Sequence, residues 1–424
     1  MNKSHYNTIY LSSWWLCIVT LPWTIPFNSF SLVALAVVCL AEGNFITKWE
    51  RLKNNTWAWS FLFFFVVHIL GLLYTQDSPA GLFEIEKKLG FLAIPLVAAS
   101  GPLFSESSFN LLKKSFIYSC LLVVVISLAY TGYSLLGNEA PLIQNFDLQT
   151  NQHFHDLNPG ASGLWEYFSY IQLGEWIDIH PAYFSMYLIF CIAILVNQMM
   201  ECRIINARDL SIIILFTFFI VLLSSRMAIV SLTLVMLYFL FHYLKRNLNR
   251  KVILLTSLFF VFLFALIFLN PVARFRIIQE PLTTSLQIDH SNQVWNSVSF
   301  RWLEWKASLH ALRGSWLLGV GTGDGQAALQ EFYENFNAST SRLDYNAHNQ
   351  YLQTAVELGV AGLFGLLLCL WRPFLSSIQP TPIHVAFIIL FGLMCLTESM
   401  LARQKGIVFF TLFQSLLSRS NYSQ

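Results

Sequence analysis

Two arginines and a histidine lie where long apolar stretches of this chain meet polar sequence. Arg226 lies within residues 222–228, with membrane-like sequence on both sides, and Arg301 opens a run rich in tryptophan and charge. His348 lies between the longest polar segment and an apolar stretch that continues to Trp371. Arginine is a permanent cation and histidine changes charge near neutral pH, so these residue types suit anion binding and proton transfer.

Each of the three also has a purely structural interpretation. Arginine inside or beside a membrane is a functional hypothesis by default, but Arg226 also fits an arginine that extends to the interface at a helix end. Arg301 fits the solvated face of a loop helix, in which Trp302, Trp305 and Leu309 form an apolar side against the membrane surface. His348 fits a polar helix start.

Five further residues are candidates for binding a substrate, and they are Lys88, His180, Asn349, Glu398 and Arg403. Glu398 and Arg403 flank a predicted turn, where a local ion pair is the structural alternative. His180 precedes a proline that opens an apolar segment. Lys88 belongs to a charged run, 84–88, for which an exposed surface is the alternative.

Metal and nucleotide sites are not expected. His153, His155 and Asp156 lack a further ligand at a suitable spacing, and the seven cysteines form no CxxC pair. Residues 319–325 read GVGTGDG, but no buried strand precedes them and no Walker lysine follows, so they predict a glycine-rich turn. We therefore expect no cofactor, and the net charge of +2 gives no reason to expect a nucleic-acid partner.

Composition identifies the elements that must position these side chains. Of 424 residues, 56% are hydrophobic and 11% are charged, whereas soluble domains average about 25% charged residues. The fold class is therefore all-α, a polytopic helical bundle in a membrane. We predict about twelve spanning segments, near 11–25, 29–42, 57–74, 89–100, 113–136, 181–199, 209–224, 227–244, 251–269, 347–371, 382–398 and 404–418.

The short loops determine the expected orientation. Lysine and arginine gather after the even-numbered segments, which places both termini in the cytoplasm. Residues 1–424 then form one transmembrane domain with two extracytoplasmic loops, 137–179 and 270–346. We expect helices in the second loop, one of them over 299–312.

The segment that follows His348 combines polar and small residues. We expect Asn349, Gln350 and Gln353 to be solvated. Glycines recur at 359, 362 and 365, a spacing that lets a neighbouring helix backbone come close.

Together these stretches resemble the superfamily of O-antigen ligases, which includes O-antigen polymerases and protein O-oligosaccharyltransferases. The resemblance rests on SSRMAIVSL (224–232), RWxxW through LLGVGTG (301–323), AHNQYLQTAVELGVAGLFG (347–365) and TESMLARQKGIVFF (397–410), with weaker support from HPAYFSMYL at 180–188. It covers roughly the last 250 residues.

The resemblance implies a glycosyltransferase of the bacterial inner membrane whose active site faces the periplasm. The donor is a glycan on undecaprenyl diphosphate, and the acceptor is a hydroxyl, with lipid A-core favoured. Arg226 and Arg301 would stabilise the leaving diphosphate, and His348 would accept the hydroxyl proton, in an inverting, metal-independent reaction. The alternatives are a glycan polymerase, a protein O-oligosaccharyltransferase, or a non-enzymatic transporter of lipid-linked glycan.

Overall fold

The computed structural model describes residues 3–137, 146–147, 152–153, 164–202, 204–245, 250–283, 297–336, 345–375 and 379–420. Helices dominate these residues, and two-residue strands β1 (Phe146–Asp147) and β2 (Gln152–His153) pair antiparallel. The first helices are α1 (Lys3–Thr20), α2 (Ile25–Ala41), α3 (Phe45–Asn54), α4 (Thr56–Leu72), α5 (Ser78–Lys88), α6 (Gly90–Ser100), α7 (Glu106–Leu136), α9 (Leu164–Tyr167) and the 3-10 helix η2 (Tyr170–Ile177).

The remaining helices include both long apolar ones and short ones near the polar segments. They are α10 (Pro181–Cys202), α11 (Ala207–Leu222), α12 (Arg226–Leu244), α13 (Arg250–Leu269), α14 (Pro271–Arg274), the π-helical turn η3 (Phe275–Gln279), α15 (Glu280–Thr283), α16 (Ser297–Ser315), α17 (Gly325–Phe336), α18 (Gln350–Trp371), η4 (Arg372–Leu375), α19 (Pro382–Met394) and α20 (Gln404–Ser420). The helix predicted over 299–312 is confirmed as α16.

Each of the twelve predicted apolar segments falls on a helix. Among the described residues, five helices are long and apolar enough to cross a membrane, namely α7, α10, α12, residues 252–269 of α13, and α18 with η4. The α2–α3 pair would make a sixth although it bends by 114°, and α4 and α19 are shorter apolar helices. The chain is thus an integral helical membrane protein, and the count of twelve spans stays a prediction.

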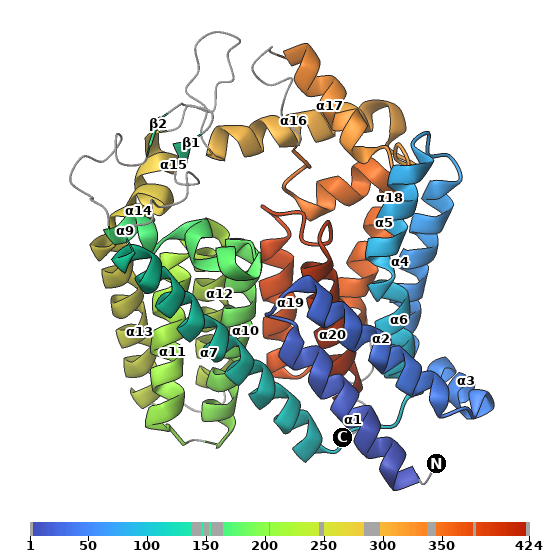
Figure 1. Cartoon of the computed structure of the whole chain (residues 1–424), viewed down its shortest axis with the longest axis horizontal. Helices are drawn as coiled ribbons and strands as arrows, with labels where there is room; N and C mark the ends of the chain where they lie inside the picture. The colour runs from blue at the N-terminus through green and yellow to red at the C-terminus, as the bar shows by residue number, and fades with distance from the viewer. Residues whose placement is uncertain are drawn as a thin grey trace.

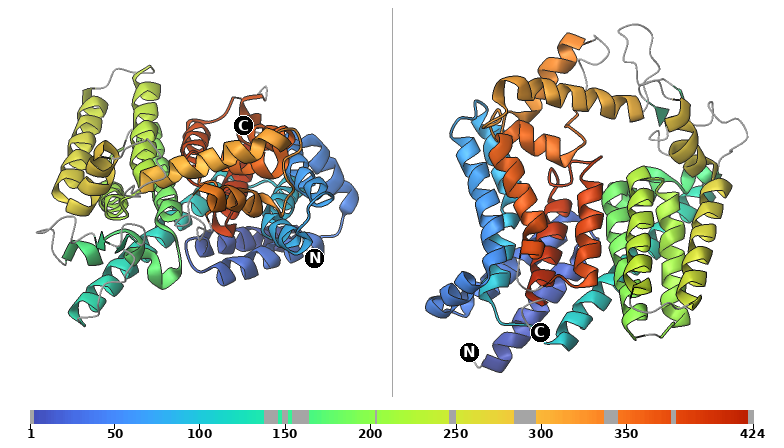
Figure 2. Two further views of the ribbon diagram at one scale, coloured as in Figure 1. Left: turned by 90° about the horizontal axis from the view of Figure 1, so that it is seen from above. Right: turned by 180° about the vertical axis from the view of Figure 1, so that it is seen from behind.

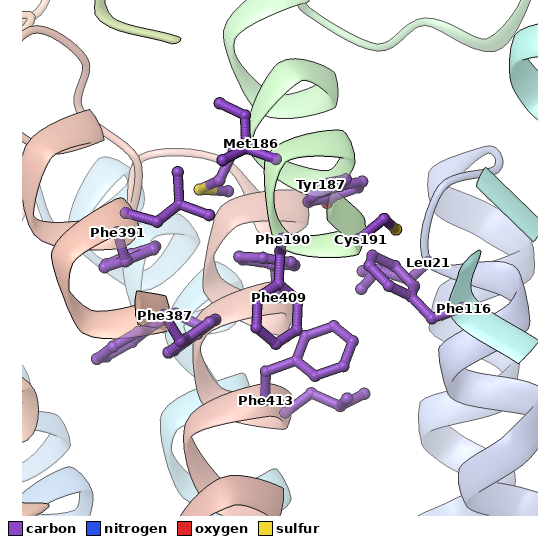
Figure 3. Close-up of a cluster of buried hydrophobic side chains, with 14 of the residues drawn as sticks. Leu21, Phe116, Met186, Tyr187, Phe190, Cys191, Phe387, Phe391, Phe409 and Phe413 are labelled. Atoms are coloured by element: carbon purple, nitrogen blue, oxygen red, sulfur yellow. The ribbon is translucent and has the colours of Figure 1, made fainter. Parts of the chain in front are cut away.

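The core is built around α10, which is buried on all sides from Pro181 to Asn197. Its Phe190 ring lies 4.7 Å from Phe413 of α20 and 5.0 Å from Phe387 of α19, measured between ring centroids. Tyr187 stacks on Phe409 at 4.8 Å (Figure 3). A helix that is apolar around its whole circumference must be buried or lie in lipid, and here its neighbours bury it.

One long helix lies across the end of the bundle. Figure 1 shows α16 running over the ends of the bundle helices, and both termini lie at the opposite end. The further views of Figure 2 show the same arrangement from above and behind.

Helix α18 is interrupted at Gly359, which has φ 61° and ψ −154°. The predicted glycine-rich turn, 319–325, lies against this break. The amides of Val320 and Gly321 donate to the carbonyls of Val356 and Glu357 at 2.8 and 3.0 Å. These bonds satisfy carbonyls that the interrupted helix leaves open, so the turn and α18 are fixed to one another.

The predicted close approach along the glycines of α18 is confirmed at Gly365. A Cβ there would lie 2.9 Å from the Phe64 ring of α4. Gly359 does not pack against a neighbouring helix but allows the break in α18. A Cβ at this position would lie 2.3 Å from the Leu317 carbonyl oxygen.

Candidate active site

Arg226 is the first residue of α12, which is an unfavourable place for a cation because a helix N-terminus is already positive. Its guanidinium compensates by pairing with Glu280 of α15, and its Nε donates to the carbonyl oxygen of Arg276. Arg226 therefore lies at the bundle end covered by the short helices, facing polar groups rather than lipid.

Glu280 connects Arg226 to the start of α16. Its Oε1 accepts from the amide and the hydroxyl of Ser297, at 3.1 and 2.7 Å. The carbonyl oxygen of Ser297 in turn accepts from Arg301 Nη1 at 3.1 Å. The two arginines thus belong to one continuous chain of polar contacts.

Arg301 points inward from α16. Its Nη2 pairs with Glu398 Oε1 at 2.8 Å, and its Nε donates to the Thr397 carbonyl at 3.1 Å. The alternative of a solvated helix face is wrong for this residue. The alternative of a local pair between Glu398 and Arg403 is also wrong, because Glu398 binds Arg301 and His348.

His348 completes the chain. Its Nδ1 lies 3.2 Å from Glu398 Oε2, and its Nε2 lies 3.9 Å from Glu304 Oε1. The backbone has φ 40°, a left-handed conformation that a residue with a side chain rarely adopts. Such strain persists only where the surroundings enforce it, and it often marks functional sites.

The residues after His348 hold it in place. The Asn349 side chain caps α18 by accepting from the amides of Tyr351 and Leu352 at 3.0 and 3.1 Å. Gln350 fixes the loop that carries Glu398, since its amide donates to the Cys395 carbonyl and its Oε1 accepts from the Leu401 amide.

The prediction that this first turn is solvated is wrong. Asn349, Gln350 and Gln353 are all buried. Their amide groups are used to pair backbone, which includes the bond from the Ala347 amide to Gln353 Oε1 at 2.9 Å.

Electrostatics separates the two carboxylates beside His348. Burial alone would raise the pKa of Glu398, but the hydrogen bond from His348 and the charge of Arg301 hold it well below its usual range. Burial raises the pKa of Glu304 to about 7, against the opposing charges of His348 and Arg301. For His348, burial would lower the pKa, but the bond to Glu398 and the charge of Glu304 raise it above its usual value.

Part of the chain is similar to a known protein family. The model of the O-antigen ligase family matches residues 211–367. Over this stretch the chain is similar to O-antigen ligases. No curated protein matches the chain. The matched stretch begins in α11, ends in α18, and includes Arg226, Arg301 and His348. Glu398, which contacts Arg301 and His348, lies after the end of this stretch.

Two other candidates lie near this chain of polar contacts. Burial lowers the pKa of His180 to about 4; Glu398 opposes this shift, whereas Arg403, His348 and Arg301 add to it. Its Nδ1 accepts from the Ala182 amide at 3.3 Å, which caps α10 and leaves Nε2–H as a donor. Arg403 is exposed on the loop before α20.

Lys88 stands apart from the other candidates. Its ammonium lies 2.6 Å from Glu84 and 4.0 Å from Glu357 of α18, and its side chain is only 3% exposed. The surface alternative is therefore wrong, and the lysine is already neutralised. Coulombic attraction from Glu357 and Glu84 outweighs burial and raises its pKa. A role for Lys88 in donor binding stays a prediction.

Three residues of the site escaped the sequence analysis. Glu304 follows Arg301 by three residues, a spacing that puts both on one helix face and could have revealed it. Glu280 carries no such signal. Arg276 stacks on Tyr170 with its guanidinium carbon 3.7 Å from the ring centroid, and its buried Nε has no hydrogen-bond partner among the described residues.

No group of three or more metal-ligating side chains occurs in the part of the chain that the structure describes. His155 and Asp156 lie outside the described residues.

Proposed function

We propose that this protein is a membrane glycosyltransferase that moves a glycan from undecaprenyl diphosphate to an acceptor hydroxyl, with lipid A-core favoured. One observation carries the proposal. Arg226, Arg301 and His348, far apart in sequence, are linked through Glu280, Ser297 and Glu398 at one end of the bundle. The O-antigen ligase match over residues 211–367 supports the same conclusion.

The two arginines suit a diphosphate leaving group. Arg301 has five N–H donors, of which the bonds to Thr397, Ser297 and Glu398 use three. Arg226 adds its charge to the positive end of α12, so an anion there meets both a guanidinium and a helix N-terminus. As the glycosidic bond breaks, these cations stabilise the electron pair that stays on the phosphate oxygen. This arrangement makes the reaction independent of metal.

His348 suits the acceptor side. With Nδ1–H donating to Glu398, the lone pair of Nε2 is free to accept the hydroxyl proton. The acceptor oxygen then attacks the anomeric carbon directly as the diphosphate leaves, and the configuration of that carbon is inverted. His180 and Arg403 lie beside the chain of polar contacts that contains His348. In this proposal they bind sugar or phosphate oxygens of the substrates.

The proposed topology follows from the same arrangement. Residues 1–424 form one transmembrane domain of the bacterial inner membrane, with loops 137–179 and 270–346 outside and both termini in the cytoplasm. Support comes from the position of both termini at the bundle end opposite α16 (Figure 1). The polar chain then faces the periplasm.

The test uses purified protein, an undecaprenyl-diphosphate glycan and three separate acceptors: lipid A-core, a second lipid-linked glycan, and a protein. Mass spectrometry identifies which acceptor gains sugar, with EDTA present. We expect transfer to lipid A-core that His348→Ala abolishes. Transfer to the second lipid-linked glycan would identify the protein as a polymerase, and transfer to the protein would identify it as a protein glycosyltransferase. No transfer by folded protein that binds the donor would favour a transporter.

A further inference from the structure

Glu304 is a buried carboxylate that faces the catalytic histidine candidate. It lies on α16 one turn beyond Arg301, and its side chain is 4% exposed. Its Oε1 lies 3.9 Å from His348 Nε2, and its Oε2 has no hydrogen-bond partner among the described residues. The carboxylate is therefore positioned at the same ring nitrogen that accepts the proton in the proposed reaction.

The surroundings of Glu304 are apolar. A small separate cluster of Phe300, Leu303, Ala307, Leu329, Tyr333 and Ala347 packs around this face of α16. Burying a charged group with an unpaired oxygen is unfavourable, so groups of this kind concentrate at functional sites. The titratable and charged groups that act on Glu304 come from several elements, namely His348, Arg301, Glu398 and, from α17, Tyr333.

The two carboxylates beside His348 have different environments. Glu398 is in direct contact with Arg301, which stabilises its charged form and makes it a poor proton acceptor. Glu304 has no ion pair with an arginine in the described part of the chain, and burial raises its pKa to about 7. Two carboxyl groups whose environments give them different pKa values can take separate roles in one reaction, one staying charged and the other gaining and losing a proton.

We infer that Glu304 is the terminal proton acceptor for His348. The inference rests on the proposed function. The acceptor O–H bond breaks as its oxygen bonds to the anomeric carbon, and the diphosphate leaves with the electron pair of the glycosidic bond. The proton passes to His348 Nε2 and then to Glu304 Oε1, which returns the imidazole to its neutral form. Glu398 keeps its charge and holds the ring orientation throughout.

In this assignment Glu304 does not take the proton from the acceptor hydroxyl itself but receives it from His348. It explains why both ring nitrogens face a carboxylate: Nδ1 faces one that orients the ring, and Nε2 faces one that can be protonated. After turnover Glu304 releases its proton to water, and the site returns to its starting charge.

The test compares Glu304→Gln and Glu304→Asp with the exposed control Glu331→Gln from α17. The infrared carboxyl band of reconstituted protein without substrate is titrated first, and transfer rates are then measured against pH. We expect a carboxyl that titrates near neutral pH in the wild type and is missing in Glu304→Gln. We also expect Glu304→Gln to lose about 10- to 100-fold in kcat while donor binding is kept, with partial recovery in Glu304→Asp.

Two results overturn the inference. One is a Glu304→Gln variant with the wild-type kcat and pH profile. The other is an infrared difference spectrum, wild type minus Glu304→Gln, that contains no titrating carboxyl band. The wild-type control separates a failure of this inference from a failure of the proposed function. If wild-type protein transfers no glycan, the proposed glycosyltransferase activity itself is contradicted. Glu304→Gln removes an unfavourable buried charge, so the variant should fold.

Discussion

The side chains of His348 and Glu398 meet at 3.2 Å although fifty positions separate them in the sequence. His348 precedes α18 and Glu398 follows α19, so the contact depends on how two helix ends are fixed together. Gln350 makes that connection by binding the Cys395 carbonyl and the Leu401 amide. The pairing of a ring nitrogen with a charged carboxylate gives the imidazole a defined tautomer and direction.

Removal of the Glu398 charge should shift the pH dependence of transfer. The base form of His348 is neutral, so activity falls as pH drops through its pKa. The hydrogen bond to Glu398 and the charge of Glu304 hold the pKa of His348 above its usual value despite burial. We expect Glu398→Gln to lower that pKa and move the acid limb of kcat/KM to lower pH, together with a lower plateau. An acid limb that stays in place in Glu398→Gln, with Glu331→Gln as control, would contradict the role of His348 as base.

The two arginines should be needed for chemistry and not for folding. Loss of a preorganised donor to a developing anion costs about 100-fold or more in rate, which we expect for Arg226→Ala and for Arg301→Ala. Arg313→Ala removes an exposed arginine from the same helix as Arg301 and should leave the rate unchanged. Transfer rates on folded protein decide the matter, and losses below about tenfold in both arginine variants would remove them from the mechanism.

Chelation should leave transfer intact. In the proposed mechanism, arginines supply the positive charge that a divalent ion would otherwise provide, so wild-type activity in EDTA should stay within about twofold of the activity without EDTA. The measurement is the initial rate after dialysis against chelator, followed by addition of Mg²⁺ or Mn²⁺. Restoration of a lost rate by either ion would show that metal is required.

The break in α18 should be intolerant of any side chain. Gly359 has positive φ, and an added Cβ would lie 2.3 Å from the Leu317 carbonyl oxygen. We expect Gly359→Ala to destabilise the fold by about 2 kcal/mol or more. Gly314→Ala is the matched control, since nothing lies within 4 Å of a Cβ there and the helix gains from alanine. Thermal unfolding in detergent compares them, and equal Tm values would contradict the docking of the glycine-rich turn.

Burial of Glu304 should make stability depend on pH. Its folded-state pKa of about 7 lies above the ordinary value, so the folded protein holds the proton more tightly. Stability from this group is therefore lost as pH rises from about 5 to about 8. Glu304→Gln cannot lose a proton, so its Tm should exceed that of the wild type by more at the higher pH. A Tm difference independent of pH would place the carboxyl in a solvated environment.

Local patterns predicted the helices well and the contacts between them poorly. Apolar length located every long helix, and the mixture of tryptophan and charge located α16. The inward direction of Arg301 was not predictable, because its partner Glu398 lies 97 positions away. Polarity also misled the expectation for Gln350 and Gln353, whose amides pair with buried backbone rather than with water.

The predicted functional residues differ in how the structure connects them. Arg226, Arg301, His348 and Glu398 form one polar chain, with His180 and Arg403 beside it. Asn349 caps α18 through its Oδ1 atom, and Lys88 lies in a separate buried ion cluster. Glycine spacing predicted close packing at Gly365 but not the break at Gly359, which requires knowing that a distant turn supplies the missing hydrogen bonds.

The most direct test of the account is a single-turnover transfer from an undecaprenyl-diphosphate glycan of defined anomeric configuration. Wild-type protein and His348→Ala are compared, with donor binding measured in parallel. The account predicts an inverted product from the wild type and a rate at least about 100-fold lower in His348→Ala, with donor affinity kept. A product of retained configuration, or an undiminished rate in His348→Ala, would contradict direct transfer with His348 as the base.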